Sequence, residues 1–181
     1  MRRTHEASRD TPYAMKIDYR YYRKLLAAYS EILQNELGDS LVSLILYGSV
    51  ARGEAKKESD IDLLIVVRGE KRSYYEMLSP IMKAENKLKS NPVYKEFSDG
   101  SYPYFSYLVL SQDEASESHN IYLDILADGI VLHDPARFFS ERLKHFKMRV
   151  KELGSKKVTL PDGRWYWDLK PDLVPGEVFE L

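Results

Sequence analysis

The sequence contains no cysteine among its 181 residues. Disulfide bonds and thiolate metal sites are therefore excluded. Asparagine and glutamine are also scarce, numbering only six together, while charged residues make up 30% of the chain. A shortage of thermolabile amides beside abundant charge is typical of proteins from heat-loving organisms, and we expect such a source.

Long apolar runs are missing as well. No run approaches the roughly 20 residues that a membrane-spanning helix needs. Arg2 and Arg3 are followed by polar residues rather than by the apolar core of a signal peptide. Neither sign of charge dominates, because 27 basic and 28 acidic residues give a net charge of -1. We therefore expect a cytoplasmic protein without a membrane partner, and nucleic acid is not the expected partner either.

The length suits one domain with a substantial core. Residues 1–14 are polar and aperiodic, so we expect a disordered leader there. Residues 15–134 then form the main domain. Residues 135–181 add a helix, a hairpin and a tail, which we expect to pack on the same domain.

Hydrophobic periodicity predicts alternating helices and strands. Helices are predicted over 18–37, 74–88, 112–127 and 136–153, strands over 41–47, 61–67, 102 or 104 to 110 and 130–132, and a hairpin around 161–163. Asp18 suits the N-cap of the first helix, and Gly38 suits the position after its end. Pro80 is expected to kink or restart the second helix.

The chemically informative stretch begins where the first predicted strand ends. Gly48 follows that strand and lets the backbone turn and approach a phosphate closely. Ser49 adds a hydroxyl donor, and the N–H groups of a following helical turn would point at the anion. Arg52 lies just beyond and is within reach of a phosphate. These residues predict a phosphate-binding turn.

After ten intervening residues beyond Ser49, the second strand is headed by Asp60 and Asp62. Side chains two residues apart on a strand face the same side, so the two carboxylates point together. Mg²⁺ in proteins takes one or two carboxylates plus substrate phosphates and water. Metals held there would stabilise both the attacking and the leaving oxygen of an in-line displacement. The alternative is an ordinary turn followed by a surface acid pair, but the two features together beside apolar runs favour one site.

This stretch resembles the signature of the minimal nucleotidyltransferase family, within the DNA polymerase beta-like superfamily. The resemblance implies an α/β (α+β) fold, with a small mixed sheet flanked by helices and a further C-terminal helix and tail. It also implies Mg²⁺ dependence, with two ions when the triphosphate is bound, and transfer of a nucleoside monophosphate with release of pyrophosphate. By position, Gly48 and Ser49 would contact the phosphates, and Asp60 and Asp62 would be the catalytic metal ligands.

The wider superfamily usually supplies a third carboxylate from a neighbouring strand. The third predicted strand has no acid, and Ser106 occupies roughly the expected place. Asp124 falls in a predicted helix, where we expect a solvated or capping acid.

Two functions remain open. The first is an enzyme that transfers a nucleotide, AMP from ATP above all, to a hydroxyl group. Small members of the resembled family work as antitoxins beside HEPN-type partners, which would make a protein tyrosine the acceptor. The alternative is a catalytically degenerate Mg–NTP-binding antitoxin or interaction module. Residues 165–167, Trp-Tyr-Trp, are expected to pack on their own domain, with a homodimer or partner interface as the alternative.

Overall fold

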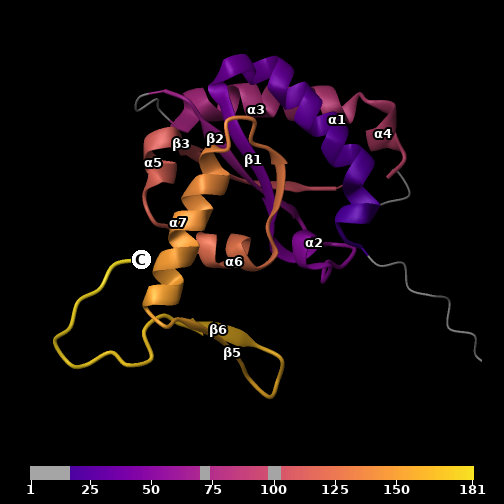
Figure 1. Ribbon diagram of the computed structural model, residues 1–181. Helices are drawn as coiled ribbons and strands as arrows, with labels where there is room; N and C mark the ends of the chain where they lie inside the picture. Colours follow the sequence, from indigo (N-terminus) through magenta and orange to yellow (C-terminus); the bar gives the residue numbers. More distant parts are fainter. Residues whose placement is uncertain (1–16, 70–73, 98–102) are drawn as a thin grey trace, which may run out of the picture.

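The computed structural model describes residues 17–69, 74–97 and 103–181. The predicted leader over 1–14 therefore lies outside the described residues. The centre is a four-stranded sheet in the order β3-β2-β1-β4, and a separate two-stranded sheet pairs β5 with β6 (Figure 1). The strands are β1 (Leu41–Tyr47), β2 (Ile61–Val67), β3 (Phe105–Ser111), β4 (Ile130–His133), β5 (Lys156–Thr159) and β6 (Trp165–Asp168).

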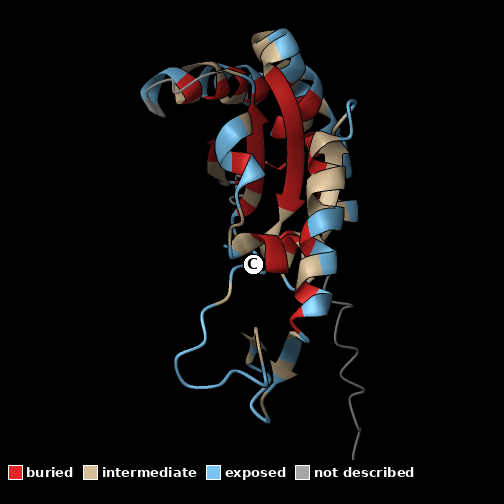
Figure 2. Cartoon of the chain, turned by 60° about the vertical axis from the view of Figure 1, so that its left-hand side comes forward, coloured by how far each residue is buried: buried red, intermediate tan, exposed pale blue. Residues whose placement is uncertain are grey.

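The four-stranded sheet is mixed. Strand β1 runs antiparallel to β2 and to β4, whereas β2 and β3 are parallel. The two central strands, β1 and β2, are almost wholly buried (Figure 2), which explains why their sequences are continuous apolar runs rather than alternating ones. The predicted class, a small mixed sheet flanked by helices, is confirmed.

The helices cover both faces of this sheet (Figure 1). They are α1 (Tyr19–Leu37), α2 (Gly48–Arg52), α3 (Tyr74–Lys89), α4 (Pro92–Lys95), α5 (Gln112–Ser116), α6 (Ile121–Asp128) and α7 (Phe138–Glu152), with a short 3₁₀ turn, η1 (Gly38–Ser40), before β1. Helices α1, α3 and α4 pack on one face of the sheet, and α5, α6 and α7 pack on the other. None of the helices in the described part of the chain is long and apolar enough to cross a membrane.

Helix α1 begins where the sequence predicts. The carboxylate of Asp18 accepts a hydrogen bond from the backbone N–H of Arg20 at 2.9 Å, which caps the helix. Of the two outcomes predicted for Pro80, a restart of the second helix is wrong, because α3 continues from Tyr74 to Lys89 through it, while a kink stays a prediction. Proline removes one backbone hydrogen bond, and the buried stripe that α3 packs against α1 compensates for this loss.

The single helix predicted over 112–127 is also wrong, since two short helices, α5 and α6, occupy this stretch. Ser111 and Glu114 form a capping box that starts α5 immediately after β3. Helix α5 ends at Ser116, and the chain turns before α6 starts at Ile121. This turn matters for the site, because it lets α6 pack against α2.

Helix α7 is tied to the sheet through Asp134. This carboxylate accepts hydrogen bonds from the hydroxyl of Ser43 on β1 at 2.9 Å and from the hydroxyl of Ser140 on α7 at 2.6 Å. The backbone N–H groups of Phe139 and Ser140 donate to the same carboxylate. One acid therefore joins the start of α7 to a central strand.

Candidate functional site

The predicted phosphate turn and the predicted acid pair meet at the end of β1. Tyr47, the last residue of β1, pairs with Asp62 on the antiparallel strand β2. Gly48 follows with a backbone φ of +74°, in the left-handed region that favours glycine. A Cβ atom on Gly48 would lie 2.1 Å from Oδ2 of Asp62. The backbone of the turn thus lies directly against the carboxylate, and no larger residue fits.

The acid pair has a hydroxyl beside it instead of a third acid. Asp60 precedes β2 and is exposed, whereas Asp62 is half-buried within the strand. Ser106 lies opposite Asp62 on the parallel strand β3, and its hydroxyl donates a hydrogen bond to the Asp62 carboxylate. The place that a third acid would take is therefore filled by a neutral donor.

The surroundings of Asp62 favour its protonated form, because nearby positive charge does not balance its burial and the charge of Asp60. Burial raises the pKa of Asp62 above its ordinary value, and the nearby negative charge of Asp60 raises it further. The hydrogen bond from Ser106 and the positive charge of Arg52 lower this pKa but do not offset the increase. A cation bound between the two carboxylates would relieve the same repulsion.

Ser49 and Arg52 both lie on α2. Ser49 is half-buried in the first turn of this helix, directly after Gly48. The Nε atom of Arg52 donates to Oε2 of Glu54 at 3.0 Å, and the charge of Arg52 also acts on Asp62. The structure therefore brings the predicted residues of the turn together with Asp62, and it places one guanidinium beside them.

Asp124 is an acid of this site that the sequence did not reveal. It lies half-buried on α6, which packs against α2. Burial raises the pKa of Asp124, while the positive charges of Arg52 and Lys157 lower it. Burial raises the pKa of Tyr47, and the negative charges of Asp62 and Asp124 raise this pKa further. One signal was available: Asp124 is the only charged residue in the otherwise apolar run from Ile121 to Ala127.

The donor set fits magnesium. Within residues 17–69, 74–97 and 103–181, no three histidine, cysteine, aspartate or glutamate side chains are grouped so that they could hold a metal ion. Two carboxylates and a neighbouring hydroxyl remain, and all are hard oxygen ligands. Mg²⁺ is usually bound through one or two carboxylates and completes its shell with substrate phosphates and water. Asp60 and Asp62 could therefore hold Mg²⁺ together with a bound phosphate.

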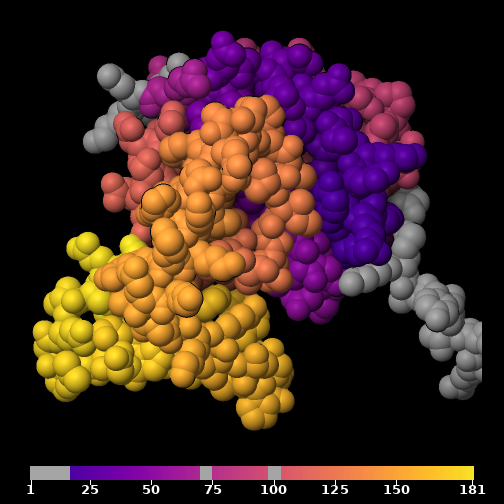
Figure 3. All heavy atoms as spheres, in the orientation of Figure 1, coloured from indigo at the N-terminus to yellow at the C-terminus, as the bar shows by residue number. Residues whose placement is uncertain are grey.

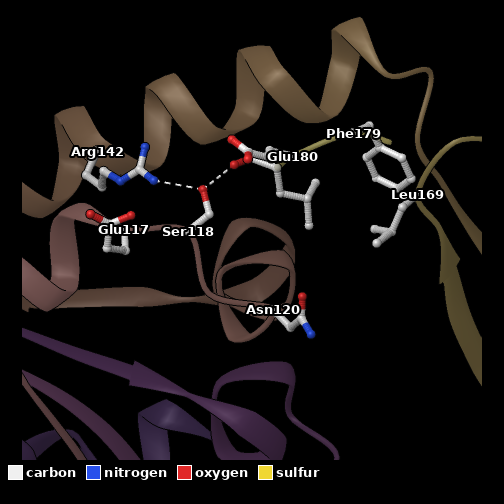
Figure 4. A pocket seen from close by; sticks show the side chains of 8 residues that line it. Glu117, Ser118, Asn120, Arg142, Leu169, Phe179 and Glu180 are labelled. Carbon is white, nitrogen blue, oxygen red and sulfur yellow. Dashed lines mark hydrogen bonds between the residues drawn. The ribbon is translucent and has the colours of Figure 1, made fainter. Parts of the chain in front are cut away.

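A large cavity of about 680 Å³ lies elsewhere, between α7, the chain before α6 and the C-terminal tail (Figure 4). Its lining residues are Glu117, Ser118, Asn120, Arg142, Leu169, Phe179, Glu180 and Leu181. The Nη2 atom of Arg142 donates to the hydroxyl of Ser118 at 2.9 Å, and that hydroxyl donates to the backbone carbonyl of Leu181. These contacts hold the tail on α7. The cavity is lined by none of the residues of the turn or of the acid pair.

Comparisons with known proteins agree with the motif. Residues 26–105 match the family model described as a nucleotidyltransferase domain. A protein of Methanocaldococcus jannaschii, named as a candidate protein adenylyltransferase, is 36% identical over 52 residues, which make up 29% of this chain and 35% of the relative. The chain thus matches about a third of that relative's length.

Solved structures with a similar arrangement are more distant in sequence. A candidate nucleotidyltransferase from Sulfolobus solfataricus is 20% identical, with a TM-score of 0.40 over 65% of this chain and 87% of that one. A chain from the complex of a tri-AMPylated Shewanella oneidensis HEPN toxin with an MNT antitoxin is 12% identical, with a TM-score of 0.40 over 73% of this chain and 92% of that one.

The family match covers β1, α2, β2 and the start of β3, and so includes the turn at Gly48 and both acids of the pair. Asp124 and the β5–β6 hairpin lie beyond it. Over residues 26–105 this chain is therefore similar to nucleotidyltransferase domains.

Proposed function

We propose that this chain is a Mg²⁺-dependent nucleotidyltransferase that moves a nucleoside monophosphate, AMP in preference, from a nucleoside triphosphate to a hydroxyl group on a protein. The observation that carries the proposal is the contact between Gly48 and Asp62. A Cβ atom on Gly48 would lie 2.1 Å from the Asp62 carboxylate. A phosphate held at the turn would therefore lie beside the acid pair.

The reaction joins an acceptor hydroxyl oxygen to the α-phosphorus, while the bond from that phosphorus to the pyrophosphate oxygen breaks and the hydroxyl proton passes to solvent. Backbone N–H groups at the start of α2 and the hydroxyl of Ser49 are suited to hold the phosphates. Arg52 offers positive charge to the departing pyrophosphate. The carboxylates of Asp60 and Asp62 would hold Mg²⁺, which, when bound, neutralises the charge on the phosphate oxygens.

A protein acceptor is favoured by the relative from Methanocaldococcus jannaschii, which is named as a candidate protein adenylyltransferase. The resemblance of the motif to minimal nucleotidyltransferases makes a HEPN-type protein the partner that we propose first. In that case the acceptor is a tyrosine hydroxyl of the partner.

A second function is favoured by one observation. Strand β3 presents Ser106 opposite Asp62, and a serine hydroxyl is a poor base compared with a carboxylate. A protein with this site could bind Mg–NTP without transferring the nucleotide. It would then act as a binding module that neutralises its partner by contact alone.

Label transfer separates the two functions. Purified protein is incubated with each α-labelled triphosphate and Mg²⁺ in a lysate of the source cells, beside the double variant Asp60→Asn, Asp62→Asn. An Asp172→Asn variant is the matched control, because Asp172 is an exposed acid in the tail. We expect a labelled protein with wild type and with the control but not with the double variant. Mg–NTP binding without any transfer would support the binding module and contradict the enzyme.

A further inference from the structure

The β5–β6 hairpin lies beside the candidate site although it is distant in sequence. It follows α7, lies below α6 in Figure 1 and fills the space next to it in Figure 3. The Nζ atom of Lys157 on β5 lies 4.0 Å from Oδ2 of Asp128, the last residue of α6. Since α6 packs against α2, the hairpin is one helix away from the phosphate turn.

A continuous series of opposite charges connects the acid pair to this hairpin. Arg52 acts on both Asp62 and Asp124. Lys157 acts on Asp124 as well, and Asp128 adds a second acid on the same helix. Leu64 and Val66 share a face of β2 with Asp62, and they belong to the buried cluster on which Trp167 of the hairpin packs. The hairpin therefore borders the same face of the sheet as Asp62.

One face of the hairpin, its inner face, points toward the body of the protein. It consists of Lys157, Thr159, Trp165 and Trp167, because Lys157 pairs with Trp167, Thr159 pairs with Trp165, and residues two apart on a strand share a face. Trp167 packs against the buried cluster beneath α6 and α7. Tyr166 alternates to the outer face, where it is 50% exposed.

Trp165, unlike Trp167, is not among the residues that pack on this buried cluster. Its ring is half-buried, and the Nζ atom of Lys157 lies 4.1 Å from the ring centroid. The cation lies over one face of the indole, so the other face offers a planar surface next to positive charge. Nucleobases stack on such aromatic side chains with little dependence on sequence, and the neighbouring cation favours a phosphorylated ligand.

We propose that Trp165 and Lys157 form the nucleoside side of the site, where Trp165 stacks on the base of the nucleoside triphosphate and Lys157 contacts its ribose or α-phosphate. This inference rests on the proposed function. The phosphates would lie along α2 from Gly48, with the α-phosphorus beside the acid pair. The nucleoside would then extend past α6 to the hairpin, which lies outside the residues that match the family model.

Two ligands test the proposal, Mg–ATP and Mg–tripolyphosphate, with their dissociation constants measured by calorimetry. Tripolyphosphate has no base and occupies only the phosphate turn. For Trp165→Ala we expect the dissociation constant of ATP to rise about 10-fold and that of tripolyphosphate to stay unchanged. Trp165→Phe retains an aromatic plane and should stay within about 3-fold of wild type for both ligands. Tyr166→Ala, on the outer face of the same hairpin, is the matched control and should change neither constant.

Four results would overturn the proposal. Unchanged ATP binding by Trp165→Ala would show that the base does not bind at the hairpin. If the Michaelis constant for the acceptor rose in this variant instead, the hairpin would bind the acceptor. Equal weakening of both ligands by Trp165→Phe would show that the indole supports the fold and does not bind the base. If wild type bound neither ATP nor tripolyphosphate, the proposed function would fail together with this inference. If wild type bound tripolyphosphate but not ATP, only the role proposed for the hairpin would be contradicted.

Discussion

The backbone of Gly48 lies against the side chain of Asp62. The two residues belong to consecutive elements that meet at one end of β1, and Tyr47, beside Gly48, is the residue that pairs with Asp62. A Cβ atom at position 48 would lie 2.1 Å from Oδ2 of Asp62 and 2.9 Å from its Cγ. The requirement for glycine here is thus both steric and conformational.

Gly48→Ala should destabilise the protein and abolish Mg–NTP binding. The new methyl group must displace the Asp62 carboxylate, and alanine must adopt a φ near +74°. Gly38→Ala is the matched control, because Gly38 also has a positive φ, +50°, but nothing lies within 4 Å of its added Cβ. We expect the control to lower the free energy of unfolding by about 1 kcal/mol and to keep nucleotide binding. Equal binding by the two variants, measured by calorimetry, would contradict the steric account.

Asp62→Asn should abolish transfer without destabilising the fold. Burial and the charge of Asp60 raise the pKa of Asp62, so the folded state binds this proton more tightly than the unfolded chain does. Stability therefore falls as pH rises through the interval between the unfolded value, about 3.9, and the raised value. Asparagine lacks that penalty. Near neutral pH, well above the ordinary pKa of an aspartate, Asp62→Asn should have a melting temperature equal to or higher than that of wild type. Its transfer rate should fall at least about 100-fold.

A clear drop in the melting temperature of Asp62→Asn at that pH would contradict the claim that the ionised Asp62 carboxylate destabilises the folded state. Below the ordinary pKa of an aspartate, the carboxyl group is protonated in both states, so the difference between variant and wild type should disappear there.

Ser106→Ala should move the pH dependence of transfer. The Ser106 hydroxyl donates to the Asp62 carboxylate and lowers its pKa, so removing the hydroxyl raises that pKa further. Because the ionised carboxylate is the metal ligand, the acid limb of the pH–rate profile should shift to higher pH. The rates are measured at saturating Mg–ATP. A limb that stays in place, or shifts to lower pH, would show that Ser106 does not set the charge state of Asp62.

The sequence predicts which residues of one continuous segment form the site, but it predicts less well which residues of other strands lie beside them. The spacing from Gly48 to Asp62 indicated a shared site, because each half adjoins an apolar run long enough to be a buried strand. The pairing of Asp62 with Ser106 could be expected only in outline, since it depends on the register between β2 and β3. Neighbouring strands fix a register through contacts that lie far apart in sequence.

The two corrections to the predicted helices have different causes. Residues 112–127 have helical composition throughout, but the chain breaks after Ser116, where α5 ends. The sequence predicts a solvated or capping Asp124, whereas this residue is half-buried on α6, which packs against α2. Pro80 shows the opposite effect, since tertiary packing of α3 outweighs a local helix breaker.

Asp134→Asn should lower stability without changing transfer. Burial alone would raise the pKa of Asp134, but hydrogen bonds from Ser140, Ser43 and the backbone of Phe139 lower it below its ordinary value. The stability that this carboxylate contributes is present above the unfolded pKa and is lost as pH falls through the folded one. We expect a loss of about 1–2 kcal/mol in the free energy of unfolding near neutral pH.

The loss caused by Asp134→Asn should shrink once the pH falls below about 4. Denaturant unfolding at several pH values measures it. A loss that is independent of pH over that range would contradict the account, and so would a parallel loss of transfer activity in the folded variant.

The central claim is that Gly48, Ser49, Asp60 and Asp62 together form one site for Mg²⁺ and a nucleoside triphosphate. Calorimetric titration of ATP into the protein, with Mg²⁺ and with EDTA, tests it most directly when wild type is compared with the double variant Asp60→Asn, Asp62→Asn. We predict binding by wild type that requires Mg²⁺, and none by the double variant. Equal binding by the two proteins, or binding by wild type that is indifferent to Mg²⁺, would contradict it.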